Sequence, residues 1–162
     1  MSNENARYLA IMIESLEKKS AILDDIIEEN VRQADILGRT DRESEDDLQD
    51  SVDKKSDMID RLEELDEGFS RLYEKIEAAI NSNTGAYAKE IAGMQELIRE
   101  ITDKTVKIET QESRNKSMAS LYFSGALKRV NEKRATRNAA DIYRKNMKKI
   151  QIVGPQFMDK SN

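Results

Sequence analysis

Apolar residues recur at intervals of three and four residues along most of the chain, and this spacing constrains the fold more than any other feature. In a first stripe, seven of nine positions are apolar: Leu9, Ile13, Leu16, Ser20, Leu23, Ile27, Asn30, Ala34 and Leu37. A second stripe is apolar throughout: Met58, Leu62, Leu65, Phe69, Leu72, Ile76 and Ala79. The third stripe fails where Glu112 and Asn115 follow its regular members, which are Tyr87, Ile91, Met94, Ile98, Ile101, Thr105 and Ile108. The spacing predicts three long helices that each bury one face.

Two short polar segments mark the ends of these helices. Gly38 suits a left-handed helix end, and Thr40 followed by Glu43 three residues later has the pattern of a capping box. The second segment, residues 81–85, is rich in Asn and Ser, and its Thr84 is a candidate cap for the third helix. Connections this short predict that consecutive helices are antiparallel.

Together these signals predict an all-α fold, an antiparallel three-helix bundle of the coiled-coil type. We expect helices at about residues 4–37, 41–80 and 85–150. Because the third helix is longer than its partners, we expect it to extend beyond the bundle, to bend or to fold back. Gly68 and Gly93 lie singly within helical patterns and indicate close packing or a local bend.

The composition narrows the class of protein. The chain has 162 residues, of which 36% are charged, and it contains no Trp, so the expected core is thin. It contains no Cys and therefore no disulfide, which fits a reducing compartment. No apolar run approaches the ~20 residues that span a bilayer, and residues 1–8 lack the pattern of a secretion signal. We expect a cytoplasmic protein without membrane insertion.

The charge changes sign within the predicted third helix. Residues 1–113 hold 15 basic and 29 acidic side chains, a net charge of -14, whereas residues 114–162 hold 12 and 3, a net charge of +9. We therefore divide the chain into an acidic bundle core (1–113, with the third helix counted as 85–113), a basic second half of helix three (114–150) and a tail (151–162). The basic half contains too few carboxylates to neutralise itself.

The basic segment also carries apolar residues in two clusters that are separated by a polar stretch, and these allow two interpretations. In one, Tyr122, Phe123 and Leu127 extend the core. Their partners would then be Leu48 and Val52, and the last cluster would fold back as a fourth short helix. In the other interpretation, part of this region is an open surface that binds another helix, for which Met and Tyr side chains are well suited.

Residue types that support catalysis are scarce. There is no His, so the usual general base and the commonest transition-metal ligand are missing, and no glycine-rich phosphate loop occurs. The sequence therefore predicts a protein that is not an enzyme, with no catalytic residue, metal site or cofactor. A polybasic helix can bind nucleic-acid phosphates, but the net charge of -14 on the attached bundle opposes such binding. We expect no nucleic-acid partner.

Five short segments carry a resemblance to a known family: residues 62–69 (LEELDEGF), 95–98 (QELI), 112–116 (ESRNK), 143–147 (YRKNM) and 155–160 (PQFMDK). With them, nearly the whole chain resembles the FlgN-type flagellar export chaperones. These are small, acidic, all-helical cytoplasmic proteins that hold hook-filament junction subunits before export.

The resemblance implies that the N-terminal helices are a scaffold and that the C-terminal part of the last helix binds an amphipathic C-terminal helix of the client. Carried onto this sequence, the candidate client-binding residues are Met118, Leu121, Tyr122, Phe123, Leu127 and Val130, with Ile142, Tyr143 and Met147 as a second set. Basic residues beside them are candidates for electrostatic steering of an acidic client: Lys128, Arg129, Lys133, Arg134 and Arg137. The implied partners are hook-filament junction proteins, with components of the type III export apparatus as further candidates.

Two alternatives remain open at this point. A chaperone for another flagellar client, the filament cap protein or flagellin, would share every feature described above. A non-catalytic coiled-coil scaffold would instead oligomerise through its N-terminal heptads, with Ser20 and Asn30 at inward positions that set the register.

Overall fold

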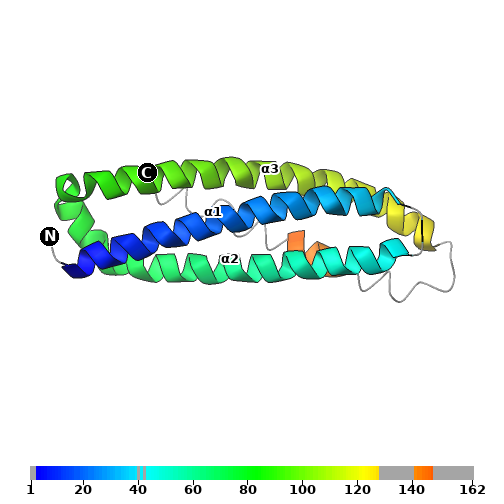
Figure 1. The fold of residues 1–162 in the computed structure, drawn as a ribbon, viewed down its shortest axis with the longest axis horizontal. Coiled ribbons are helices and arrows are strands. Elements are labelled where there is room, and N and C mark those ends of the chain that lie inside the picture. The colour runs from blue at the N-terminus through cyan, green and yellow to red at the C-terminus, as the bar shows by residue number, and fades with distance from the viewer. Residues whose placement is uncertain (1–2, 40, 42, 128–140, 148–162) are drawn as a thin grey trace.

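A computed structural model of the protein describes residues 3–39, 41, 43–127 and 141–147. Within these residues the chain contains three long helices, α1 (Asn3–Leu37), α2 (Glu43–Ser82) and α3 (Ala88–Leu127). A short 3-10 helix, η1 (Thr84–Tyr87), leads into α3, and residues 141–147 form a further short helix. The long helices pack antiparallel (Figure 1), which confirms the predicted all-α three-helix bundle.

The helix α1 lies between the other two. It packs closely against both α2 and α3, whereas the backbones of α2 and α3 approach each other less. In Figure 1 the turn between α2 and α3 lies near the N-terminus, at one end of an elongated molecule. At the opposite end, the turn between α1 and α2 lies beside the C-terminal end of α3, and the 141–147 helix (orange) packs nearer to this end. This second end therefore gathers segments that are far apart in the sequence.

The three apolar stripes form the core as predicted, and every one of their positions is buried or half-buried. Most of the core is one set of buried side chains, which we call the first hydrophobic cluster: Leu9, Met12, Leu16, Ile22, Leu23, Ile26, Ile59, Leu62, Phe69, Ile76, Ile80, Tyr87, Met94, Ile101 and Ile108. Each large aliphatic or aromatic side chain buried in this way stabilises the fold by about 1.5 to 3 kcal/mol. No helix in the described part of the chain is both long enough and apolar enough to cross a membrane.

Asp and Asn side chains cap the start of α2 and of the third helical segment. Asp41 caps α2, because its carboxylate accepts a hydrogen bond of 2.8 Å from the backbone N–H of Ser44, and the predicted cap Thr40 lies outside the described residues. Asn83, rather than Thr84, begins the third helical segment, since its side chain accepts from the N–H of Ala86 at 3.3 Å. An Asx side chain reaches these N–H groups without a change of backbone conformation.

The described glycines also behave differently from the prediction. Gly38 does not adopt a left-handed conformation, and its N–H instead donates to the carbonyls of Ala34 and Asp35 at 3.2 Å each, so the last turn of α1 simply tightens. A Cβ atom placed on Gly68 or Gly93 would meet no atom within 4 Å, so neither glycine marks a close approach of helices.

The predicted third helix does not run straight to residue 150. The described part of α3 reaches Leu127, and the hydroxyl of Tyr143 donates to the backbone carbonyl of Glu112 at 3.4 Å. In a continuous helix these two residues would be about 46 Å apart, given a rise of ~1.5 Å per residue. The chain therefore folds back, which was one of the three predicted outcomes.

Candidate functional site

A second hydrophobic cluster lies at the end of the bundle where α1 turns into α2. Its buried members are Ile36, Leu37, Leu48, Val52, Ala119 and Tyr143, and its half-buried members are Met118, Tyr122, Phe123, Ile142 and Met147. All three long helices and the 141–147 helix contribute to it. This cluster contains most of the described residues that the sequence analysis assigned to client binding, so we take this end of the molecule as the candidate site.

The candidate client-binding residues differ in exposure. Tyr122 and Phe123 are half-buried and pack edge to face, with ring centroids 5.3 Å apart, and only 4% of Tyr143 is exposed. Leu121, in contrast, leaves 77% of its surface exposed. The geometry thus matches the interpretation in which Tyr122 and Phe123 extend the core toward Leu48 and Val52, and the described part of the last apolar cluster, residues 141–147, folds back as a short helix.

Part of the predicted site lies beyond the described structure. The structure describes no side chain for Leu127 or Val130, nor for the steering candidates Lys128, Arg129, Lys133, Arg134 and Arg137. The roles of the candidate residues toward a client, described or not, stay predictions.

A buried polar layer separates the second cluster from the first. It consists of Asn30 and Gln33 of α1, Lys55 of α2, and Gln111, Glu112 and Asn115 of α3, none of them more than 7% exposed. Along each helix these residues fall between the two clusters. On α2, for example, Ile59 belongs to the first cluster, Lys55 to the layer and Val52 to the second cluster. The layer therefore crosses the bundle at one level.

Hydrogen bonds across the layer connect all three helices. Asn30 Nδ2 donates to Gln111 Oε1 at 3.1 Å, and Asn115 Nδ2 donates to the backbone carbonyl of Asn30 at 3.0 Å. Lys55 forms a buried ion pair with Glu112 and donates to Gln33 Oε1 at 3.2 Å. Each of these bonds exists only when the helices are aligned at this level, so the layer selects one helix register.

The layer also carries an electrostatic cost. Burial lowers the pKa of Lys55, because removal of the ammonium group from water outweighs its attraction to Glu112. Several polar atoms of the layer have no hydrogen-bond partner among the described protein atoms: Asn30 Oδ1, Gln33 Nε2, Glu112 Oε2 and Asn115 Oδ1. An unsatisfied buried polar atom costs about 1 to 3 kcal/mol, so this part of the molecule is less stable than an apolar core would be.

A second buried ion pair lies within the first cluster. Lys19 Nζ lies 2.8 Å from Asp66 Oδ1. Burial raises the pKa of the Asp66 carboxyl and lowers the pKa of Lys19, and in both cases desolvation is the largest cause. Two buried Lys residues at the level of the core were not anticipated from the sequence, where each is surrounded by polar neighbours.

The sequence pattern does not predict the polar layer, because Glu112 and Asn115 look like the end of an apolar stripe. In the structure they continue the stripe as buried polar residues, since only 3% of Glu112 and none of Asn115 is exposed. The available signal was Asn30, an inward polar position on the first helix. Two successive antiparallel turns leave the first and third helices parallel to each other, and this pairing brings Asn30 beside Asn115.

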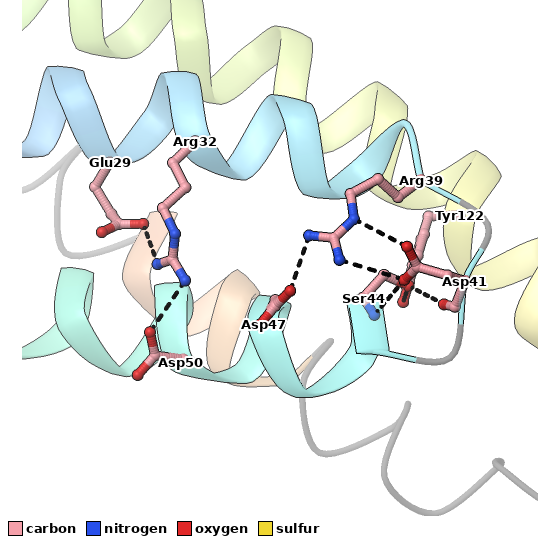
Figure 2. A network of polar contacts seen from close by, with 8 residues as sticks. All are labelled: Glu29, Arg32, Arg39, Asp41, Ser44, Asp47, Asp50 and Tyr122. Atoms are coloured by element: carbon pink, nitrogen blue, oxygen red, sulfur yellow. Dashed lines mark hydrogen bonds and ion pairs between the residues drawn. The ribbon is translucent and has the colours of Figure 1, made fainter.

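Ion pairs between charged side chains connect α1 and the turn after it to α2, beside the second cluster (Figure 2). Arg39 extends from the turn toward α2, where its guanidinium lies 2.8 Å from Asp47 and 3.3 Å from Asp41. About two helical turns before Arg39, Arg32 lies 2.9 Å from Glu29 and 3.1 Å from Asp50. The pairs of Arg39 and the Arg32–Asp50 pair are open to solvent and contribute at most about 1 kcal/mol each, so they help to align the helix ends more than they stabilise the fold.

One hydrogen bond ties this turn to the candidate site. Ser44 is buried in the first turn of α2, and its hydroxyl lies 2.9 Å from the hydroxyl of Tyr122 on α3 (Figure 2). The same hydroxyl lies 2.6 Å from the backbone carbonyl of Asp41. The position of Tyr122 is thereby coupled to the cap of α2.

Among the described residues, no group of three or more His, Cys, Asp or Glu side chains is placed to hold a metal ion. Comparisons of the chain with protein-family models, with curated proteins and with solved structures find no match.

Proposed function

We propose that the protein is a cytoplasmic flagellar export chaperone. It binds an amphipathic C-terminal helix of hook-filament junction subunits and keeps these subunits unpolymerised before type III export. The sequence resemblance motivates the choice of client. The single structural observation that supports the proposal is the second cluster, an apolar surface at one end of the bundle against which a short amphipathic helix packs.

The 141–147 helix illustrates what this end of the bundle can hold. Its apolar side chains Ile142, Tyr143 and Met147 pack against the cluster, whereas Asp141, Arg144 and Lys145 are exposed. An amphipathic client helix presents the same division of faces, with anchors at helical spacing. The exposed Leu121 lies on the outer side of α3 next to Tyr122 and adds apolar area beyond that covered by the 141–147 helix.

The charge distribution supports the same reading. The bundle core carries a net charge of -14 and the segment from residue 114 onward a net charge of +9. A positive segment attracts an acidic client helix over distances of about one Debye length, so it raises the association rate more than the affinity. A chaperone must hold its client and later release it, which requires a dissociation constant of roughly micromolar to nanomolar.

Calorimetric titration of the full chain with three C-terminal helical peptides tests the proposal. The peptides come from a hook-filament junction protein, flagellin and the filament cap protein. We expect saturable binding to the junction peptide, weakened at high salt. Binding only to flagellin or cap peptide would support the chaperone class with another client. No binding to any of the three would contradict the proposal.

Substitution of Leu121 tests the location of the site without disturbing the core. Because its side chain is exposed, Leu121→Asp should leave the melting temperature unchanged while it weakens junction-peptide binding at least about tenfold. Val106→Asp is the matched control, since Val106 is 57% exposed on the same helix but about 22 Å away along its axis. Equal effects of the two substitutions would contradict this location.

A further inference from the structure

The 141–147 helix places two buried side chains on one face, three residues apart. Only 4% of Tyr143 and 1% of Asn146 is exposed. Asn146 Nδ2 donates to the backbone carbonyl of Val52 on α2 at 2.9 Å, and the Tyr143 hydroxyl donates to the backbone carbonyl of Glu112 on α3 at 3.4 Å. The short helix therefore bridges the two long helices that approach each other least.

These two side chains cover the polar layer. The ring centroid of Tyr143 lies 5.3 Å from Lys55 Nζ, and Lys55 is the cation of the buried pair with Glu112. Lys55 and Glu112 are 1% and 3% exposed with the short helix in place. Since Tyr143 and Asn146 pack at the same level as this pair, removal of the short helix opens a path for water to the layer.

Two physical features allow the short helix to detach from the polar layer reversibly. The described part of the short helix has seven residues, far fewer than the ~12 needed for marginal stability alone, so its structure depends on its contacts with the bundle. The layer that it covers gains from hydration, because water can solvate the ion pair and can pair with the unsatisfied atoms of Asn30, Glu112 and Asn115. Opening is therefore opposed less strongly here than at an apolar layer.

We propose that the 141–147 helix is a reversible latch. When it detaches, water enters the polar layer, and the second hydrophobic cluster opens as a unit while the first cluster stays folded. The inference does not depend on the proposed function, because it rests only on contacts within the chain.

Hydrogen exchange of the full chain, followed by mass spectrometry, tests the latch. The variant Tyr143→Ala/Asn146→Ala removes both anchors, and Arg144→Ala/Lys145→Ala is the matched control on the exposed face of the same helix. We expect the anchor variant to raise exchange at least about tenfold in residues 48–55 and 112–119 and to leave residues 62–76 and 94–108 unchanged. The control should change neither region.

Three results would overturn the proposal. The first is an equal rise in both regions or unfolding of the whole bundle, because the molecule would then open as one unit. The second is no rise in either region. The third is the same rise in the control variant, because the buried anchors would then have no special role.

A second set of variants tests the part played by the ion pair. Lys55→Met/Glu112→Met makes the layer more apolar, so its hydration no longer favours opening. Added to the anchor variant, this pair of substitutions should reduce the rise in exchange at residues 48–55 from tenfold to less than about threefold. An unchanged rise would show that opening does not depend on hydration of the pair and would contradict this mechanism.

Discussion

At the scale of single residues, Lys55 and Glu112 show how a buried pair can set specificity without adding stability. Each lost its hydration on folding, and their mutual attraction replaces that loss only in part, as the lowered pKa of Lys55 indicates. The pair is therefore expected to matter most when one partner is missing. The remaining charge would then be buried without an opposite charge beside it.

Single and double substitutions of this pair should be strongly non-additive. Lys55→Met leaves Glu112 uncompensated and should lower the free energy of unfolding by about 3 to 5 kcal/mol, whereas Lys55→Met/Glu112→Met should lie near the wild type or above it. Urea denaturation of Lys55→Met, Glu112→Met, the double variant and the wild type measures the coupling. If the double variant lost as much free energy of unfolding as the two single variants together, the result would contradict this account.

At the scale of the element, the start of α2 depends on one side chain with two roles. Asp41 accepts the N–H of Ser44 and also pairs with Arg39. The cap gives the N–H of Ser44 a short hydrogen bond beside its longer one of 3.4 Å to the Asp41 carbonyl, whereas the ion pair is exposed and screened by water. The cap should therefore be the larger contribution.

Two substitutions at Asp41 separate these roles. Asp41→Ala removes both and should lower the free energy of unfolding by about 1 kcal/mol, whereas Asp41→Asn keeps a capping oxygen and should lose a few tenths. Thermal or urea denaturation distinguishes the two. If Asp41→Asn were as destabilising as Asp41→Ala, the contacts of Asp41 with Arg39 would contribute more to stability than the cap.

Docking of the 141–147 helix on the bundle should weaken at alkaline pH, because the undocked Tyr143 side chain then ionises. Burial raises the pKa of the Tyr143 hydroxyl well above its usual value of 10, and the charge of Glu112 adds to the rise. The full contribution of Tyr143 is therefore present below pH 10, where it is neutral in both states, and is lost as the pH rises above 10. The undocked tyrosine ionises there, whereas the docked one stays neutral.

Comparison of the wild type with Tyr143→Phe isolates this effect. Above pH 10, docking in the wild type should weaken by up to about 1.4 kcal/mol per pH unit relative to the variant. Hydrogen exchange in residues 48–55, followed between pH 9 and 11 and corrected for the intrinsic rate, reports docking. Parallel pH profiles for the two proteins would contradict the role of Tyr143.

At the scale of the whole molecule, the described apolar stripes are used within one chain. Ser20 and Asn30, the inward positions considered for an oligomeric scaffold, are buried against α3. The Ser20 hydroxyl lies 2.7 Å from Lys104 Nζ, and Asn30 is hydrogen-bonded to Gln111. The heptads that a scaffold would need for self-association are thus occupied by intramolecular partners.

We therefore expect a monomer of 18.6 kDa. Light scattering coupled to size exclusion should give this mass at micromolar and at near-millimolar concentrations, because the large exposed apolar residues of the described bundle, Ile11, Val31, Val106 and Leu121, do not continue the buried stripes. A mass that doubles with concentration would favour the scaffold alternative.

The sequence alone determined the helical class, the number of long helices, the antiparallel order of consecutive helices and ten of the fifteen buried residues of the first cluster. Periodicity is a local property, and an apolar stripe at this spacing is satisfied by only one kind of structure. The turns were located correctly, but Asn83 rather than Thr84 caps the third helical segment, since neighbouring Asn and Thr side chains can serve equally well in a short polar segment.

Only the tertiary structure decided how residues beyond Ile108 are used. Glu112 and Asn115 look like the end of a buried face until Lys55 and Asn30 are placed beside them. Tyr143 looks like part of a long helix until the chain reverses and brings it to Glu112. Whether a polar residue ends a core or lies buried within it depends on its partners from other helices, and these partners become neighbours only when the chain has folded.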